Sequence, residues 1–192
     1  FFFNAFNTVS ALIRVDSEQA RRLLIQLSNF FRANLQGART NLIPLMKELM
    51  QVEAYRSLEQ ARFPDRYQVT IAVEEGLEEV LLPPFLIQIL LENAFKHAFG
   101  SRKTDNRVWI DVRSSPDGVF ISVRDNGEGI DTKRLEKLGK EAVPSLEGTG
   151  SALDNLNKRL TSLFGESAKL HFVSSPTGTT VHCTVPYQER QG

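Results

Sequence analysis

Four short segments of the chain combine glycines or polar side chains in ways that suit an anionic ligand and a metal ion. The first, Glu92-Asn93-Ala94-Phe95-Lys96-His97, ends an otherwise apolar helix. Because residues three or four apart share a helix face, Asn93 is expected to lie beside Lys96 and His97. An amide oxygen suits Mg²⁺, and lysine and histidine can contact phosphate oxygens. An ordinary ion pair between Glu92 and Lys96, with His97 capping the helix, explains the same residues.

The second segment, residues 125–130, reads Asp-Asn-Gly-Glu-Gly-Ile and follows a predicted strand. Its simplest interpretation is an Asn-Gly hairpin turn. However, residues 131–142 show no alternating partner strand, and Gly129 gives more backbone freedom than a two-residue turn needs. A carboxylate at Asp125, held beside bare backbone, is well placed to accept a hydrogen bond from an adenine amino group. Both interpretations stay open for this segment alone.

The third and fourth segments are weaker signals. Gly148-Thr149-Gly150 opens a helix, an arrangement that turns free backbone N–H groups and the positive end of the helix dipole toward an anion. Gly178-Thr179-Thr180 precedes the last strand, but glycine and threonine suit any turn into a strand. Neither segment decides the function by itself.

Two amphipathic helices are predicted ahead of these segments. Apolar residues recur at helical spacing across 17–35, with Asp16 or Ser17 placed to cap the start. They recur again across 44–60, where Pro44 suits the first turn. The two helices can form a hairpin. Packing on the rest of the chain and pairing with a second chain explain their apolar faces equally well.

The remaining elements predict an α+β fold. After residue 62 the apolar period changes to two across 67–73, which predicts a strand and divides the chain into domains 1–62 and 63–192. Pro83-Pro84 opens a largely buried helix that runs to about residue 99. A strand hairpin, a helix stopped by Gly165 and two final strands follow, over 108–123, 153–163, 169–173 and 179–185. We expect a two-layer α/β sandwich, with helices on one face of a mixed sheet, preceded by the helical hairpin.

Composition and charge exclude several classes of protein. The 192 residues carry 23 basic and 23 acidic side chains, so no overall field draws the chain to nucleic acid or to an anionic membrane. No stretch approaches the roughly 18–20 apolar residues of a membrane span, and residues 1–6 lack the basic leader of a signal peptide. The single cysteine, Cys183, lies in a predicted strand and is expected to be a buried thiol.

The order of the four segments resembles the ATPase domain shared by histidine kinases, gyrase, the Hsp90 chaperone and MutL, where they are called the N, G1, G2 and G3 boxes. The resemblance covers about residues 65–187. It implies that ATP and Mg²⁺ are bound, with the metal on Asn93. The residues implied to bind the nucleotide are Asn93, Lys96, His97, Asp125, Gly127, Gly129, Ile130, Gly148, Thr149, Gly150, Ser151, Leu153 and Thr179.

The resemblance also implies a role for several members of this set. Asp125 accepts a hydrogen bond from the adenine amine with support from Thr179, while Gly127 and Gly129 let the base lie against the backbone. Glu92 and Lys96 are the implied catalytic residues.

In those roles Glu92 polarises the attacking imidazole, and Lys96 and His97 contact phosphate oxygens. Gly148 to Gly150 anchor a mobile lid drawn from about 131–147. One departure is Ala152, where many histidine kinases have a third glycine, because its methyl group can restrict the approach of the backbone to the phosphates.

Further segments are similar to the LytS-type sensor histidine kinases of bacteria. Leu82-Pro83-Pro84-Phe85 precedes the N box, and the motif from Asn155 to Leu160 follows the G2 box. Residues 1–7 match that family's His-Phe-x-Phe-Asn-x-x-Asn from its second position, and residues 55–63 resemble its second helix. The aligned phosphoacceptor histidine stands immediately before Phe1, so none of the chain's own histidines, His97, His171 and His182, is the expected acceptor.

This resemblance also implies the partners and the setting of the chain. It implies a homodimer in the intact protein and a response-regulator aspartate that receives the phosphoryl group from the histidine. It implies the cytoplasmic portion of a membrane sensor, in which residues 1–192 themselves make no membrane contact.

Two other functions stay open. The first keeps the ATP site but places it in another member of the superfamily, such as an anti-sigma serine kinase or a conformational ATPase, although those lack the Phe-x-Phe-Asn segment. The second is a dimerising scaffold whose nucleotide site is degenerate. Ala152 supports the scaffold, whereas the presence of Asn93, Asp125 and Gly127 opposes it.

Overall fold

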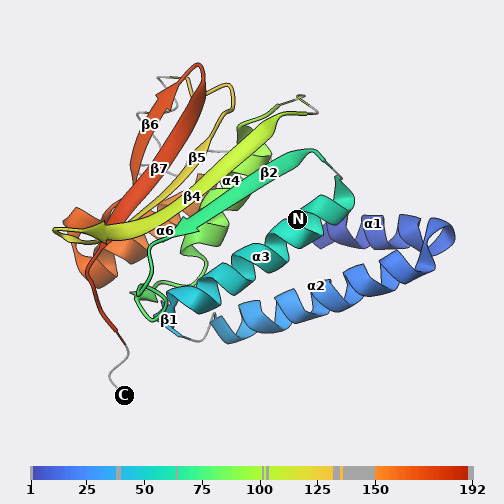
Figure 1. Cartoon of the computed structure of the whole chain (residues 1–192), viewed down its shortest axis with the longest axis horizontal. Helices are drawn as coiled ribbons and strands as arrows, with labels where there is room; N and C mark the ends of the chain where they lie inside the picture. The colour runs from blue at the N-terminus through green and yellow to red at the C-terminus, as the bar shows by residue number, and fades with distance from the viewer. Residues whose placement is uncertain are drawn as a thin grey trace.

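The computed structural model describes residues 2–37, 40–63, 65–100, 102, 104–131, 135 and 150–189. It begins with three helices, α1 (Phe2–Val15), α2 (Ser17–Gly37) and α3 (Leu45–Arg62). The first turns back along α2, and α2 in turn packs along α3 (Figure 1). Of the two predicted caps of α2, Asp16 and Ser17, it is Asp16 whose carboxylate accepts a hydrogen bond from the N–H of Gln19, at 2.8 Å.

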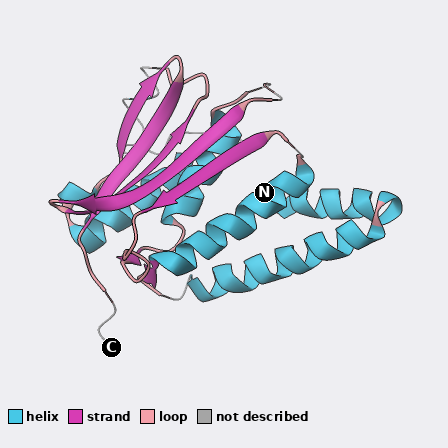
Figure 2. Cartoon of the chain, viewed as in Figure 1, coloured by secondary structure: helices cyan, strands magenta, loops and turns pink. Residues whose placement is uncertain are grey.

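A five-stranded mixed sheet forms the second part of the molecule. In spatial order its strands are β2 (Tyr67–Val73), β4 (Asn106–Ser115), β5 (Gly118–Asp125), β7 (Gly178–Val185) and β6 (His171–Ser175). The β2–β4 pair is parallel and the other neighbours are antiparallel. Helices α4 (Leu86–His97) and α6 (Gly150–Phe164), followed by the short 3-10 helix η1 (Glu166–Ala168), cover one face of the sheet (Figure 2).

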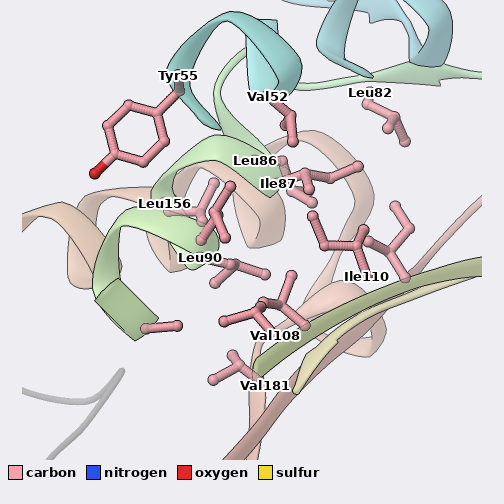
Figure 3. Packing of buried hydrophobic residues seen from close by; sticks show 14 of the residues in the cluster. Val52, Tyr55, Leu82, Leu86, Ile87, Leu90, Val108, Ile110, Leu156 and Val181 are labelled. Atoms are coloured by element: carbon pink, nitrogen blue, oxygen red, sulfur yellow. The ribbon is translucent and has the colours of Figure 1, made fainter. Parts of the chain in front are cut away.

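The hydrophobic core lies between this face and the helices. Along β7 buried residues alternate with half-buried ones, as the pleat of a strand with one covered face requires. Side chains of α4 meet those of the sheet, of α6 and of α3, as Figure 3 shows for Val52, Tyr55, Leu82, Leu86, Ile87, Leu90, Val108, Ile110, Leu156 and Val181. The thiol of Cys183 is buried as predicted, and burial raises its pKa to about 12.

A short ladder ties α3 to the sheet domain. Strand β1 (Ile43–Pro44) pairs with β3 (Leu81–Leu82) in antiparallel fashion. At the start of α3, where backbone N–H groups lack partners inside the helix, Leu45 donates to the carbonyl of Val80 at 2.8 Å and Met46 to that of Glu78 at 2.9 Å. The third helix is therefore attached at its first turn to the second part of the chain.

The predicted fold class is confirmed, and the predicted helices and strands occur with bounds that differ by a few residues. The turn from Ser115 to Gly118 joins β4 to β5, and Gly165, with a φ of 86°, follows the end of α6. Helix α1 and the β1–β3 ladder were not predicted. None of the described helices is long and apolar enough to cross a bilayer.

Candidate functional site

The end of α4, the loop after β5 and the start of β7 line a pocket. Asp125 and Asn126 also line a larger cavity of about 380 Å³ beside β6 and β7. To the pocket, α4 contributes Asn93 and His97, which share a face because they are four residues apart, and β5 ends at Asp125. Apolar side chains supply most of the remaining wall. The lining consists of Leu90, Asn93, Ala94, His97, Ala98, Val123, Asp125, Gly129, Ile130, Thr179 and Val181. Three of the four segments singled out in the sequence therefore meet at one place.

The two carboxylate oxygens of Asp125 have different surroundings. Oδ1 accepts hydrogen bonds from the N–H of Gly127 at 2.8 Å and from the N–H of Thr179 at 3.1 Å. Oδ2 accepts none from any described residue. Burial raises the pKa of Asp125, while the two N–H donors and the charge of Arg102 act to lower it. Oδ2 is thus left to accept a hydrogen bond from a donor on a ligand.

A chain of hydroxyl groups joins the loop after β5 to the last two strands. The Ser174 hydroxyl accepts a hydrogen bond from the N–H of Ile130 at 2.8 Å and lies 2.9 Å from the Thr179 hydroxyl. Thr179, itself 6% exposed, also holds Asp125 through its backbone N–H. Ser174 was missed in the sequence, because a serine beside the Ser-Pro turn gives no sign of a contact 44 residues away.

Gly127 and Gly129 are required by contacts within the protein. A Cβ at Gly127 would overlap the carbonyl oxygen of Ala98, which accepts the N–H of Glu128 at 2.9 Å. A Cβ at Gly129 would overlap the carbonyl oxygen of Ser175, and the φ of Gly129, 77°, lies in the left-handed region that favours glycine. The predicted approach of a base to these glycines stays a prediction.

Asn126 is fixed by neighbours on three sides. Its Oδ1 accepts from Nη2 of Arg102 at 2.7 Å and from the N–H of Arg107 at 2.8 Å, and its Nδ2 donates to the carbonyl of Asp105 at 2.9 Å. The sheet partners of β5 are β4 and β7. Asn126 and Gly127 are therefore not the turn of a simple hairpin, and Arg102, which the sequence did not indicate, shapes the loop.

Glu92 and Lys96 form the ion pair that the simpler interpretation of their segment predicts. Lys96 Nζ lies 2.6 Å from Glu92 Oε1, and the two side chains are 24% and 25% exposed. Neither residue lines the pocket, whereas His97 does. The ion pair of the simpler interpretation is therefore present. The metal, phosphate and catalytic roles implied for this segment stay predictions.

The third segment is only partly described. Gly148 and Thr149 lie outside the described residues, as does the predicted lid apart from residues 131 and 135. Gly150 is the first residue of α6, and the side chain of Ser151 is not described. Leu153 is buried in the core and is not part of the pocket lining.

The donor set of the pocket fits a metal ion that arrives with phosphate oxygens. Among the described residues, no group of three or more His, Cys, Asp and Glu side chains could hold a metal. The Asn93 side chain makes no hydrogen bond to another described residue, so its amide oxygen is available as a ligand. Mg²⁺ usually keeps several waters and takes one or two protein ligands together with substrate phosphates.

Two family models match the chain. Residues 1–67 match the model of histidine kinases. Residues 84–189 match the model described as histidine kinase-, DNA gyrase B-, and HSP90-like ATPase. The second match spans every residue that lines the pocket.

The chain is also similar to curated proteins of staphylococci. It is 56% identical to the sensor protein LytS of Staphylococcus epidermidis over 188 residues, which cover 98% of this chain and 32% of that protein. It is 54% identical to the sensor histidine kinase/phosphatase LytS of Staphylococcus aureus over 192 residues, or 100% of this chain and 33% of that protein. The chain therefore spans about a third of the length of these relatives.

Solved structures share its fold. The histidine kinase domain of a blue-light activated histidine kinase from Erythrobacter litoralis superposes with a TM-score of 0.58 at 20% identity, covering 92% of this chain and 85% of that chain. The catalytic domain of histidine kinase ThkA gives a TM-score of 0.59 at 16% identity, covering 76% of this chain and 96% of that chain. Identities this low support the fold alone.

Proposed function

The chain belongs to the histidine kinase-, DNA gyrase B- and HSP90-like ATPases and, among them, to the LytS-type sensor histidine kinases, and from this membership we propose that its pocket binds Mg-ATP for phosphoryl transfer to a histidine. Phosphoryl transfer needs alignment and neutralised charge more than covalent help from the protein. Asn93, His97 and Asp125 give the pocket side chains that could hold a metal, a phosphate oxygen and a base, which suits that chemistry.

The surroundings of Asp125 carry the proposal. Because two backbone N–H groups occupy Oδ1, Oδ2 can accept a hydrogen bond from the exocyclic amine of adenine. The apolar wall around it, which includes Leu90, Ile130 and Val181, suits the faces of a flat base. Thr179 keeps the carboxylate in place through its N–H.

The end of α4 would hold the triphosphate. In this proposal Asn93 coordinates Mg²⁺, His97 and Lys96 contact phosphate oxygens, and Glu92 polarises the attacking imidazole. The metal, when bound, neutralises charge on the transferred group. Lys96 and Glu92 already lie within 2.6 Å of each other, so the ion pair orients both side chains on one turn of the helix.

The partners follow from family membership and are proposals for the longer protein. We propose that the intact protein is a homodimer and that a response-regulator aspartate receives the phosphoryl group. The residues described here would then belong to the cytoplasmic portion of a membrane sensor. The acceptor histidine would align immediately before Phe1.

Calorimetric titration with ATP tests the nucleotide site. The wild-type chain is expected to bind ATP in a Mg²⁺-dependent manner. Asp125→Asn is expected to bind roughly 10- to 100-fold more weakly, because a hydrogen bond to a charged group is worth about 1.5–3 kcal/mol. The variant should also lose preference for ATP over GTP, since a carboxylate repels the oxygen that guanine carries where adenine has its amine.

Asp111→Asn is the matched control, because Asp111 lies on β4 and pairs with Arg113 outside the pocket. It should bind ATP as the wild type does. If neither the wild type nor Asp125→Asn binds Mg-ATP, the degenerate scaffold becomes the better hypothesis. If the wild type binds, extending the chain by a histidine before Phe1 and following the label from γ-labelled ATP tests the transfer step.

A further inference from the structure

A buried carboxylate from α3 holds the first turn of α4. Glu48 is fully buried, and its Oε2 accepts the N–H of Phe85 at 2.8 Å. Its Oε1 accepts the N–H groups of Ile87 at 2.9 Å and Gln88 at 3.1 Å. Donors in the first turn of a helix lack partners inside that helix. Their acceptor here comes from a different helix, so the position of α3 sets where α4 begins.

The backbone at that point is strained. Phe85 precedes α4 with a φ of 69°, in the left-handed region that costs a bulky side chain on the order of 1–3 kcal/mol. Such a conformation persists only where its surroundings determine it. The hydrogen bond from Phe85 to Glu48 is one of those determinants.

Arg159 of α6 also contacts this junction, which we define as Glu48, the first turn of α4 and the segment ahead of α3. Its Nη1 donates to the carbonyl of Pro84 at 3.2 Å, next to the strained residue. Its Nη2 donates to the carbonyls of Thr40 at 3.2 Å and Asn41 at 3.3 Å, ahead of α3. The planar guanidinium thus links Pro84 to the segment ahead of α3. The single nitrogen of a lysine cannot contact both places at once.

Two further polar side chains are buried on α3 and α4 beside this junction. Gln51, one turn from Glu48 on α3, and Gln88 on α4 are both buried, and the Oε1 atom of each has no hydrogen-bond partner among the described residues. A buried polar atom without a partner costs about 1–3 kcal/mol.

The junction connects α3 to α4, the helix that lines the pocket, and to α6. α4 carries it at its start and carries Asn93 and His97 at its end, and α6 begins at Gly150, in the segment implied to bind phosphate. We propose that Glu48 and Arg159 are positioning residues that couple nucleotide occupancy of the pocket to the packing of α3, and thereby to the α2–α3 hairpin. The inference rests on the proposed function, because the coupling needs Mg-ATP at the pocket.

Amide hydrogen exchange with and without saturating Mg-ATP tests the coupling. The reporters are the N–H groups of Leu45 and Met46, which lie on the α3 side of the junction and outside the pocket lining. In the wild type, Mg-ATP should slow their exchange by about fivefold or more, the lower end of ordinary coupling between sites. Arg159→Lys keeps the charge and loses the bridge, so it should bind Mg-ATP while the slowing at these reporters disappears.

Glu48→Gln should behave in the same way, and Arg159→Lys still decides the question if that variant fails to fold. Glu53→Gln, on the same helix and exposed, is the matched control and should keep the wild-type response. If Glu48 and Arg159 only stabilise the fold, substituting them should speed exchange at Leu45 and Met46 by the same factor with and without nucleotide. Slowing that persists in Arg159→Lys, or that never reaches Leu45 and Met46 in a wild type that binds Mg-ATP, overturns the coupling alone. A wild type that does not bind Mg-ATP overturns the proposed function and the coupling with it.

Discussion

At the scale of single residues, Gly127 is required because of the atoms around it and not because of its backbone conformation. A Cβ there would overlap the Ala98 carbonyl oxygen, although the φ of Gly127 is not left-handed. Gly127→Ala should therefore lower the free energy of unfolding by about 1–3 kcal/mol, the usual cost of overpacking. Urea denaturation measures this. Gly76→Ala is the counterpart, because Gly76 has a φ of 89° and open space around it, so only the cost of the left-handed backbone should appear. Equal losses in the two variants would contradict the steric argument.

Glu48 makes stability depend on pH. Burial raises its pKa from the ordinary 4.5 to about 7, against the three N–H donors and the charge of Arg159. The folded protein therefore holds a proton that the unfolded chain releases between these values. Its contribution to stability is complete below about pH 4.5 and is lost as pH rises through about 7.

The free energy of unfolding of the wild type, relative to Glu48→Gln, should accordingly fall by about 2–3 kcal/mol between pH 4.5 and pH 7.5, since each pKa unit is worth about 1.4 kcal/mol. Urea denaturation of both proteins across this range gives the difference. A difference that stays constant with pH would show that Glu48 does not titrate there.

The residues of the pocket and of its supporting contacts differ in how far along the chain their partners lie. Asn93, His97 and Asp125 stand in short motifs that the sequence singled out, and the structure brings them to one pocket. Ser174 and Arg159 act through partners 44 to 119 residues away, which no local pattern reveals. The burial of Glu48 could have been predicted from its spacing, because it lies three residues after Leu45 and four before Val52, on the buried face of α3.

At the scale of elements, Phe95 joins α4 to its neighbours. Its ring stacks on Tyr67 of β2 with centroids 4.3 Å apart and lies 5.9 Å from that of Tyr55 on α3. Phe95→Ala should lower the free energy of unfolding by about 3–5 kcal/mol, because the cavity borders two other elements. Phe120→Ala, on the uncovered face of the sheet beside His182, should cost clearly less. Similar losses in the two variants would contradict the inference that the Phe95 ring holds α4 to β2 and α3.

Elements with a strong apolar period were predictable and those built by pairing at a distance were not. The period of two in β2 and the period near four in α2 and α3 led to correct assignments. The two-residue strands β1 and β3 carry no period, and they exist because Ile43 meets Leu82 across 39 residues of chain. Helix α1 was missed because residues 1–7 were interpreted through their motif and not through their helical spacing.

At the scale of the whole molecule, the division into domains 1–62 and 63–192 stays a prediction. The β1–β3 ladder, the Glu48 cap and the stack of Tyr55 on Phe95 all tie α3 to the sheet domain. α3 therefore connects the first two helices to the sheet domain, which holds the pocket.

The surface of the first two helices leads to a last prediction. Large apolar side chains are exposed there: Phe6, Ile13, Leu24 and Ile25, at 49%, 60%, 48% and 47%. We expect this surface to pair two chains, so Ile25→Lys should weaken self-association by about 100-fold or more, because each symmetric dimer loses two buried apolar side chains worth about 1.5–3 kcal/mol apiece. Sedimentation velocity over a range of concentrations measures the association. Val173→Lys, at an exposed apolar position on β6, should associate as the wild type does. If both variants associate equally, the dimer forms through another surface, and the exposed face of α1 and α2 has some other partner.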